Sequence, residues 1–205
     1  MKVTALKEKR KAITAVTLDD GSELLLDSET VYIEKIKVGS VINDVDELIY
    51  KSDYKRAKSR ALWYLSRSSH SEKALFDKLI RGGFSETASK DAVERMRELS
   101  LIDDEAFAAR LAEYYKGSGI SAREAVQKMQ QKGIERSLAA SFFEDEEDEK
   151  DKIKYLLEHK YAKKLGDEES VKKVFAALIR KGFSYRDVRD ALKDYSEEIL
   201  YSEEE

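Results

Sequence analysis

The chain has 205 residues, of which 39% are charged and 41% hydrophobic, and its formal net charge is −4. This balance is typical of a folded, highly charged protein and excludes a disordered one. The absence of cysteine excludes disulfides, thiolate metal sites and cysteine nucleophiles, and the absence of proline favours uninterrupted helices. Because neither a signal peptide nor a membrane-spanning stretch is recognisable, we expect a cytoplasmic protein without membrane contact.

The net charge conceals an uneven distribution of basic and acidic residues. Residues 1–50 have a net charge of −3 and residues 144–205 a net charge of −6, whereas residues 51–143 carry 18 basic and 13 acidic residues, a net charge of +5. A basic middle segment suits contact with a polyanion or an acidic protein surface. The imbalance is too small to indicate tight binding to free DNA.

Residues 1 to about 42 have strand character. Apolar and β-branched runs flank Asp19-Asp20-Gly21, which is a strong short-range signal for a β-hairpin. We therefore expect a small β-rich module over residues 1–50, built around this hairpin. The string "NDVDELIYKSD" then begins a helical remainder.

One short pattern occurs three times in that remainder. It consists of a serine, an amphipathic stretch and, twelve residues after the serine, a glycine; the glycines are 50 and 49 residues apart. The serine is expected to cap the helix and the glycine to end it in the left-handed conformation. In the second copy, Ser121 with Glu124 predicts a capping box. The serine–glycine pairs are Ser71 and Gly83, Ser121 and Gly133, and Ser170 and Gly182.

The residue after each glycine should fold back onto the side chain four positions before the glycine. The pairs are Phe84 with Leu79, Ile134 with Met129, and Phe183 with Leu178. Further helices precede and follow each copy, near 53–66, 86–99, 104–116, 135–144, 149–165 and 185–196.

The predicted fold class is therefore mainly α: a tandem array of three three-helix repeats, elongated and curved, after a small N-terminal β-hairpin module. One repeat cannot bury its apolar face alone, so neighbouring repeats should stack. The expected boundaries are 1–50 for the β module, then 51–100, 101–145 and 146–205, the last with an acidic C-terminal tail. The acidic run at 144–151 is interpreted as a solvated helix start, with flexing of the third repeat as a further hypothesis.

Three strings give the chain a resemblance to the RecX family, bacterial regulators of the RecA recombinase. They are "RALWYLSRSSHSEKALFDKLIRGGFS", "LIDDEAFAARLAEYY" and "SAREAVQKMQQKGI", between about residues 60 and 134. The resemblance implies a non-enzymatic protein that lies in the groove of the RecA–single-stranded DNA filament and limits filament growth, ATP hydrolysis and strand exchange. It implies RecA as the partner, leaves contact with the DNA open, and implies no cofactor; we expect a monomer.

A recurring row of cations on the middle helices is the candidate binding surface. The position ten before each glycine is always basic, and the position two before it is basic in two of the three copies. The alternative is an ordinary solvated helix face. Arg67, in the turn after the first helix, is a further candidate, or else caps the C-terminus of that helix. The candidate partner-binding residues are Arg67, Lys73, Lys78, Arg81, Arg123, Lys128, Lys132, Lys172 and Arg180.

Other suggestive residues are better explained by structure than by chemistry. Asp103, Asp104 and Glu105 favour a helix N-terminus over a metal site. His70 and His159 lie in different repeats, so a shared site is disfavoured. The aromatic pairs at the ends of two first helices are expected in the core, with stacking on bases as the alternative. They are Trp63 with Tyr64 and Tyr114 with Tyr115.

Two other classes of function compete with a filament regulator. The third helices balance basic with acidic residues, which disfavours direct base reading and leaves at most a weak DNA-binding protein. No phosphate-binding glycine loop, partnered nucleophile or metal cluster indicates an enzyme. A general helical-repeat adaptor for protein interactions remains the main alternative.

Overall fold

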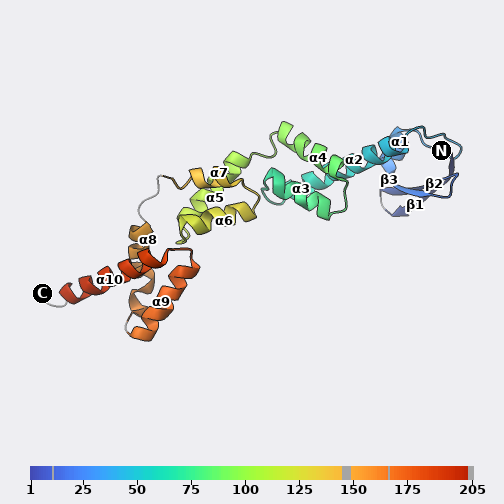
Figure 1. Cartoon of the computed structure of the whole chain (residues 1–205). Coiled ribbons are helices and arrows are strands. Elements are labelled where there is room, and N and C mark those ends of the chain that lie inside the picture. Colours follow the sequence, from blue (N-terminus) through green and yellow to red (C-terminus); the bar gives the residue numbers. More distant parts are fainter. Residues whose placement is uncertain (11, 145–148, 166, 203–205) are drawn as a thin grey trace. The chain divides into compact units, whose positions relative to one another are not determined.

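A computed structural model of the protein describes residues 1–10, 12–144, 149–165 and 167–202 (Figure 1). The fold is mainly α-helical with a small antiparallel sheet near the N-terminus, as the sequence predicts. Contacts divide the chain into two compact units, Met1–Asp103 and Asp104–Glu205. The finer division at residues 50, 100 and 145 stays a prediction.

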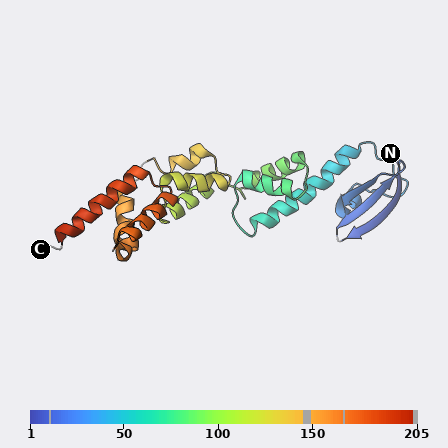
Figure 2. The ribbon, with the colours of Figure 1, turned by 60° about the horizontal axis from the view of Figure 1, so that its bottom comes forward.

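The N-terminal sheet contains three strands in the order β1-β2-β3, paired antiparallel (Figure 2). The strands are β1 (Val3–Arg10), β2 (Ile13–Leu18) and β3 (Glu23–Asp27). The predicted hairpin joins β2 to β3: Gly21 has φ +83° and its N–H donates to Leu18 O at 3.1 Å. The Asp20 carboxylate accepts from Ser22 N–H at 2.9 Å and fixes the turn.

A short helix, α1 (Ser28–Ile33), follows β3, so the prediction of strand character up to residue 42 is wrong there. Asp27 caps this helix, accepting from the N–H groups of Glu29 and Thr30, each at 3.2 Å. The capping carboxylate satisfies two N–H groups that an isolated helix end would leave free, and this offsets the low helix propensity of the β-branched residues that follow. The cap signal was present in "DSET".

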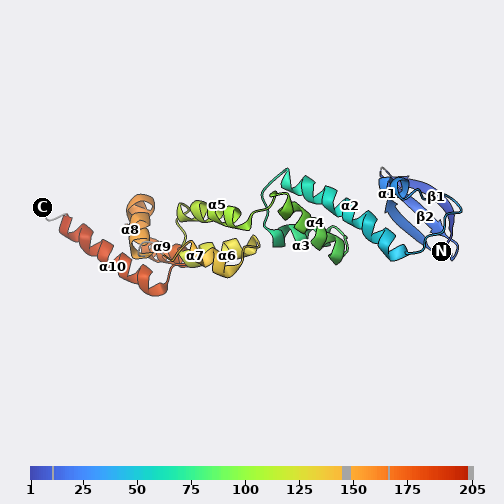
Figure 3. The same cartoon turned by 90° about the horizontal axis from the view of Figure 1, so that it is seen from above.

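The helix α2 (Val45–Leu65) belongs to two cores at once (Figure 3). Near its start, Leu48 is buried with the sheet, whereas Ala57 and Ala61 are buried with the helices of the first repeat. Polar contacts also bind α2 to β3: Asp27 N–H donates to Ser52 Oγ at 2.7 Å, and Lys55 Nζ lies 3.2 Å from the Asp27 carboxylate. The sheet and the first repeat therefore share one continuous helix.

A hydrogen bond from Tyr50 to Asp91 joins α2 to α4 (Glu86–Glu98), and we expect its loss to be measurable. The Tyr50 hydroxyl donates to Asp91 Oδ2 at 2.5 Å. This bond, with partial burial and the nearby negative charge, raises the pKa of Tyr50 to about 12. Tyr50→Phe should lower the free energy of unfolding by about 1 kcal/mol near neutral pH.

The contribution of this hydrogen bond to the free energy of unfolding should depend on pH. Because the pKa of Tyr50 is raised on folding, its contribution is complete below about pH 10, the ordinary value, and is lost as the pH rises towards 12. The difference in urea unfolding between the wild type and Tyr50→Phe should therefore shrink between about pH 8 and pH 11. A difference that stays constant over this range would contradict the assignment.

The three glycine closures are confirmed. Gly83, Gly133 and Gly182 have φ values of +85°, +87° and +92°. After each glycine the next N–H reaches back five residues, giving the Schellman pattern that seals the last turn of a helix. The bonds are Phe84 N–H to Leu79 O at 3.3 Å, Ile134 N–H to Met129 O at 3.1 Å, and Phe183 N–H to Leu178 O at 3.4 Å.

Two of the three predicted serine caps are present. Ser71 Oγ accepts from Ala74 N–H and Ser121 Oγ from Glu124 N–H, both at 3.1 Å. Ser170 is not a cap, because Asp167 lies one turn earlier and accepts the Ser170 N–H at 2.8 Å. A carboxylate at this position accepts both the backbone N–H and the serine hydroxyl and suits the helix dipole, so the helix starts sooner.

The helices of the repeats otherwise lie near their predicted positions. The third repeat differs most: its first helix ends early and continues as a π-helical turn (Leu157–Tyr161) and a 3₁₀ turn (Ala162–Lys164), where one helix was expected over 149–165. The remaining helices are α3 (Glu72–Arg81), α5 (Asp104–Lys116), α6 (Ala122–Gln131), α7 (Arg136–Ser141), α8 (Glu149–Leu156), α9 (Glu168–Arg180) and α10 (Tyr185–Ser202).

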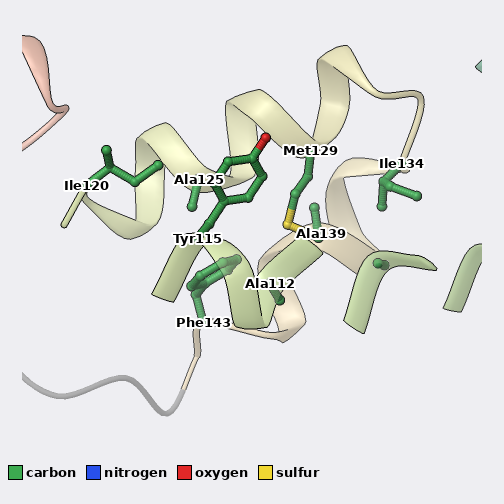
Figure 4. Close-up of a cluster of buried hydrophobic side chains, with 9 residues drawn as sticks. Ala112, Tyr115, Ile120, Ala125, Met129, Ile134, Ala139 and Phe143 are labelled. Atoms are coloured by element: carbon green, nitrogen blue, oxygen red, sulfur yellow. The ribbon is translucent and has the colours of Figure 1, made fainter. Parts of the chain in front are cut away.

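Each repeat has its own cluster of buried side chains, separate from the cluster under the sheet. In the second repeat Tyr115 of α5 and Met129 of α6 point into the space between the helices (Figure 4). Small residues at Ala112, Ala125 and Ala139 let these helices approach closely. On the middle helices of the other repeats, the buried residues equivalent to Met129 are Leu79 and Leu178.

The second and third repeats are joined at the N-terminus of α6. Ser121 N–H donates to Lys181 O at 3.0 Å, and Ala122 N–H donates to Glu149 Oε1 at 2.8 Å. The predicted capping box is therefore only half formed, because the Glu124 side chain pairs with Lys128 and not with Ser121 N–H. Within the acidic run, residues 145–148 lie outside the described residues, so the flexing hypothesis stays open.

Candidate partner-binding surface

The middle helices α3, α6 and α9 present the predicted row of cations in equivalent settings. Burial along 71–80 and 121–130 follows the same sequence of buried, intermediate and exposed positions, because both helices pack one apolar stripe. Lys73, Arg123 and Lys172 are all exposed. Lys172 pairs with Glu168 one turn earlier at 2.6 Å, on the solvent side of α9.

The two arginines near the helix ends also adopt matching geometry. Arg81 Nε donates to Asp77 O at 3.1 Å, and Arg180 Nε donates to Ala176 O at 3.3 Å. Each guanidinium is thus tethered one turn back along its own helix and stays exposed. The same position in α6 is Gln131, so the second repeat lacks this charge.

The remaining predicted lysines are in different environments. Lys78 is partly buried, with Nζ 3.2 Å from His70 Nε2 and 4.9 Å from the centre of the Tyr64 ring. Lys128 is also partly buried and lies 3.2 Å from the Glu124 carboxylate. Lys132 is exposed beside the second glycine closure. Of these three lysines, Lys132 is the most exposed.

Arg67 belongs to a second cluster, which shares only Lys78 with the candidate cations of the middle helices and which we name the Trp63 surface. Its guanidinium lies 4.4 Å from the centre of the Trp63 ring, and that of Arg60 lies 5.4 Å from it. Cations at these distances are attracted to the face of an indole ring. The Trp63 surface consists of Arg60, Trp63, Tyr64, Arg67, His70 and Lys78.

The expectation that all four terminal aromatic residues lie in the core is wrong for two of them. Trp63 is 45% exposed and Tyr114 is 69% exposed, whereas Tyr115 is buried and Tyr64 packs against the core of the first repeat. Neighbouring residues on a helix point about 100° apart, so one member of a pair can pack in the core while the other faces solvent. The outer member is left available to a partner.

The acidic residues predicted to be structural do lie at a helix start: Asp104 and Glu105 occupy the first turn of α5. Across the described ranges, no group of three or more histidine and acidic side chains is placed to hold a metal ion. Among the helices that the structure describes, each is too short or too polar to span a bilayer.

Sequence reasoning missed two groups of residues. Arg60 was overlooked, although a signal for it was present. It precedes Trp63 by three positions, a spacing that places both residues on one helix face. The lysines between 150 and 164 were overlooked because residues 144–205 as a whole have a negative net charge. The string "KDKIKYLLEHKYAKK" was the available signal.

The fold and surface define a class of proteins built from tandem three-helix repeats with exposed, repeating cations. The family model described as RecX, first three-helix domain, matches residues 57–96, which cover the C-terminal part of α2, all of α3 and most of α4. A crystal structure of regulatory protein RecX resembles this fold with a TM-score of 0.58 at 23% identity, covering 94% of this chain and 98% of the other.

Similar sequences extend the likeness over most of the chain. Regulatory protein RecX of Streptococcus mutans is 27% identical over 99% of this chain and 83% of its own length. Regulatory protein RecX of Caldanaerobacter subterraneus subsp. tengcongensis is 28% identical over 91% of this chain and 95% of its own length. The chain is thus similar to regulatory protein RecX over most of its length, and its residues 57–96 match the RecX first three-helix domain.

Proposed function

We propose that this protein is a non-enzymatic regulator of the RecA recombinase. It binds the groove of the RecA–single-stranded DNA filament and limits filament growth, ATP hydrolysis and strand exchange. It acts in the cytoplasm as a monomer, without a cofactor. Its relatives carry the name regulatory protein RecX, which supports the regulatory role.

The observation that carries the proposal is the repetition of one exposed cation, at Lys73, Arg123 and Lys172. A protein filament offers identical sites at regular intervals, so a series of equivalent side chains can engage several subunits at once. Individually weak contacts then multiply in effect, because each contact raises the effective concentration of the next. A single globular partner would give no reason to repeat the position.

The direct test measures DNA-dependent ATP hydrolysis by RecA with substoichiometric amounts of this protein. The wild type should reduce the rate at concentrations well below that of RecA. A triple charge reversal, Lys73→Glu, Arg123→Glu and Lys172→Glu, should require about tenfold more protein for the same inhibition, because each lost contact removes favourable electrostatic energy.

The matched control reverses Lys90, Arg136 and Arg186 to glutamate. These exposed residues lie on the third helices, outside the cation row, and the change in net charge is the same. This variant should inhibit like the wild type. Equal inhibition by the two triple variants would reject the cation row, and no effect of the wild type on RecA would reject the proposed function.

A further inference from the structure

A hollow of about 660 Å³ lies between the second and third repeats, and no residue of the cation row lines it. One wall is the Gly117-Ser118-Gly119 loop after α5, and the other is α8 with its π-helical turn. The loop lies so close to α8 that a Cβ added at Gly119 would be 3.0 Å from Leu156 Cδ2. The hollow is thus a built feature of the junction between two repeats of one compact unit.

The lining of this hollow is cationic. Lys116, Lys152, His159 and Lys160 border it, and none of the described residues that line it is acidic. Lys116 and Lys160 form no ion pair with any residue that the structure describes. Burial and then the charge of Lys160 lower the pKa of the nearby Lys181. The site is therefore suited to a phosphate group.

An exposed aromatic platform stands beside these cations. Tyr155 is 60% exposed, and its ring stacks on His159 with centroids 4.2 Å apart and planes 21° apart. His159 Nδ1–H donates to Tyr155 O at 3.0 Å and fixes the imidazole. The carboxylate of Glu158 lies 3.9 Å from the same nitrogen. The π-helical turn, a feature often found at functional sites, carries His159 and Lys160.

We propose that this hollow binds single-stranded nucleic acid, with a backbone phosphate among the lysines and the adjoining base stacked on Tyr155. The pairing of an exposed aromatic face with a cationic groove is the arrangement by which single strands are held without sequence preference. An acidic protein surface would use the lysines but not the aromatic platform. The proposal is independent of binding to RecA and concerns the protein alone.

The test measures fluorescence anisotropy of a short labelled oligothymidylate with the full-length protein in the absence of RecA. Tyr155→Ala should weaken binding about tenfold, the effect of losing one stacked base. Lys160→Gln should weaken binding and reduce the slope of log affinity against log salt by about 0.7, the value for one phosphate of a single strand. Lys163→Gln, at an exposed lysine three residues further on, is the matched control and should bind like the wild type.

Two further probes separate stacking from charge alone. An abasic strand of the same length should bind the wild type and Tyr155→Ala equally. Polyglutamate stands in for an acidic protein surface and should compete poorly with the oligothymidylate. The proposal is overturned if the wild type does not bind the oligothymidylate, if Tyr155→Ala binds it normally, or if polyglutamate competes as well as the unlabelled oligonucleotide. Because Tyr155 is largely exposed, the variants should keep the helical circular dichroism of the wild type.

Discussion

Gly182→Ala should lower the free energy of unfolding by about 2–5 kcal/mol, because the substitution strains two features at once. Gly182 has φ +92°, where an alanine is disfavoured by about 1–2 kcal/mol. Its added Cβ would also lie 2.3 Å from Ser121 Oγ and 2.7 Å from Glu124 Cβ, inside the junction of the second and third repeats. Relieving that overlap requires the third repeat to move away from α6 and adds about 1–3 kcal/mol.

Gly83→Ala is the matched control for this prediction. Gly83 closes α3 with nearly the same backbone conformation, φ +85°, but an added Cβ would meet no atom within 4 Å. This variant should therefore lose only the conformational term, about 1–2 kcal/mol. Urea unfolding followed by circular dichroism gives both values, and equal losses would show that Gly182 has no role in the junction.

Hydrogen exchange locates the effect of Gly182→Ala. The N–H groups of Ser121 and Ala122 bond to Lys181 and Glu149 of the third repeat, so they should exchange faster in this variant. The N–H of Ala125 bonds within its own repeat, to Ser121 O at 3.0 Å, and should stay protected. In Gly83→Ala all three should exchange as in the wild type. Unchanged exchange at Ser121 and Ala122 in Gly182→Ala would contradict the expected separation.

Leu79→Ala should lower the free energy of unfolding by about 3 kcal/mol. Leu79 is completely buried in the core of the first repeat and lies at the point where the glycine closure returns the chain to α3. Its removal leaves a cavity that the surrounding helices fill only in part, so the loss of van der Waals contacts adds to the lost burial of apolar surface.

The adjacent residue provides the control for that variant. Ile80 lies on the same helix and is 39% exposed, so Ile80→Ala removes a similar volume without opening an enclosed cavity. Its loss should be below about 1 kcal/mol, because the site is open to water and alanine has the higher helix propensity. Urea unfolding of the two variants measures the difference; similar losses would contradict the assignment of Leu79 to the core.

The sequence predicted those parts of the fold that depend on local patterns. The glycine closures were predictable because a left-handed residue, an apolar stripe and a returning apolar residue lie within one short segment. The cap of α9 was not predicted, because Ser170 and Asp167 both offer oxygen atoms to the same helix end. Only their relative geometry shows that Asp167 accepts the hydrogen bond.

The candidate site was predictable only in part, for a physical reason. The cations on α3, α6 and α9 follow a helical period, so their spacing alone places them on one face of each helix. The hollow beside Tyr155 brings together residues that are distant in sequence, because Lys116 and Lys160 come from different repeats. Their proximity depends on how the repeats pack at Ser121 and Gly182, and no short motif encodes that packing.

The helix α2 has a mechanical consequence for the N-terminal unit. Its 21 residues extend about 31 Å at 1.5 Å per residue, with one end fixed in the sheet and the other in the first helical repeat. Because one continuous helix connects the two cores, a ligand that rotates the sheet would also rotate α3 and its cations. Insertion of a single residue in the middle of α2 would rotate its two ends by about 100° relative to each other without replacing any existing side chain.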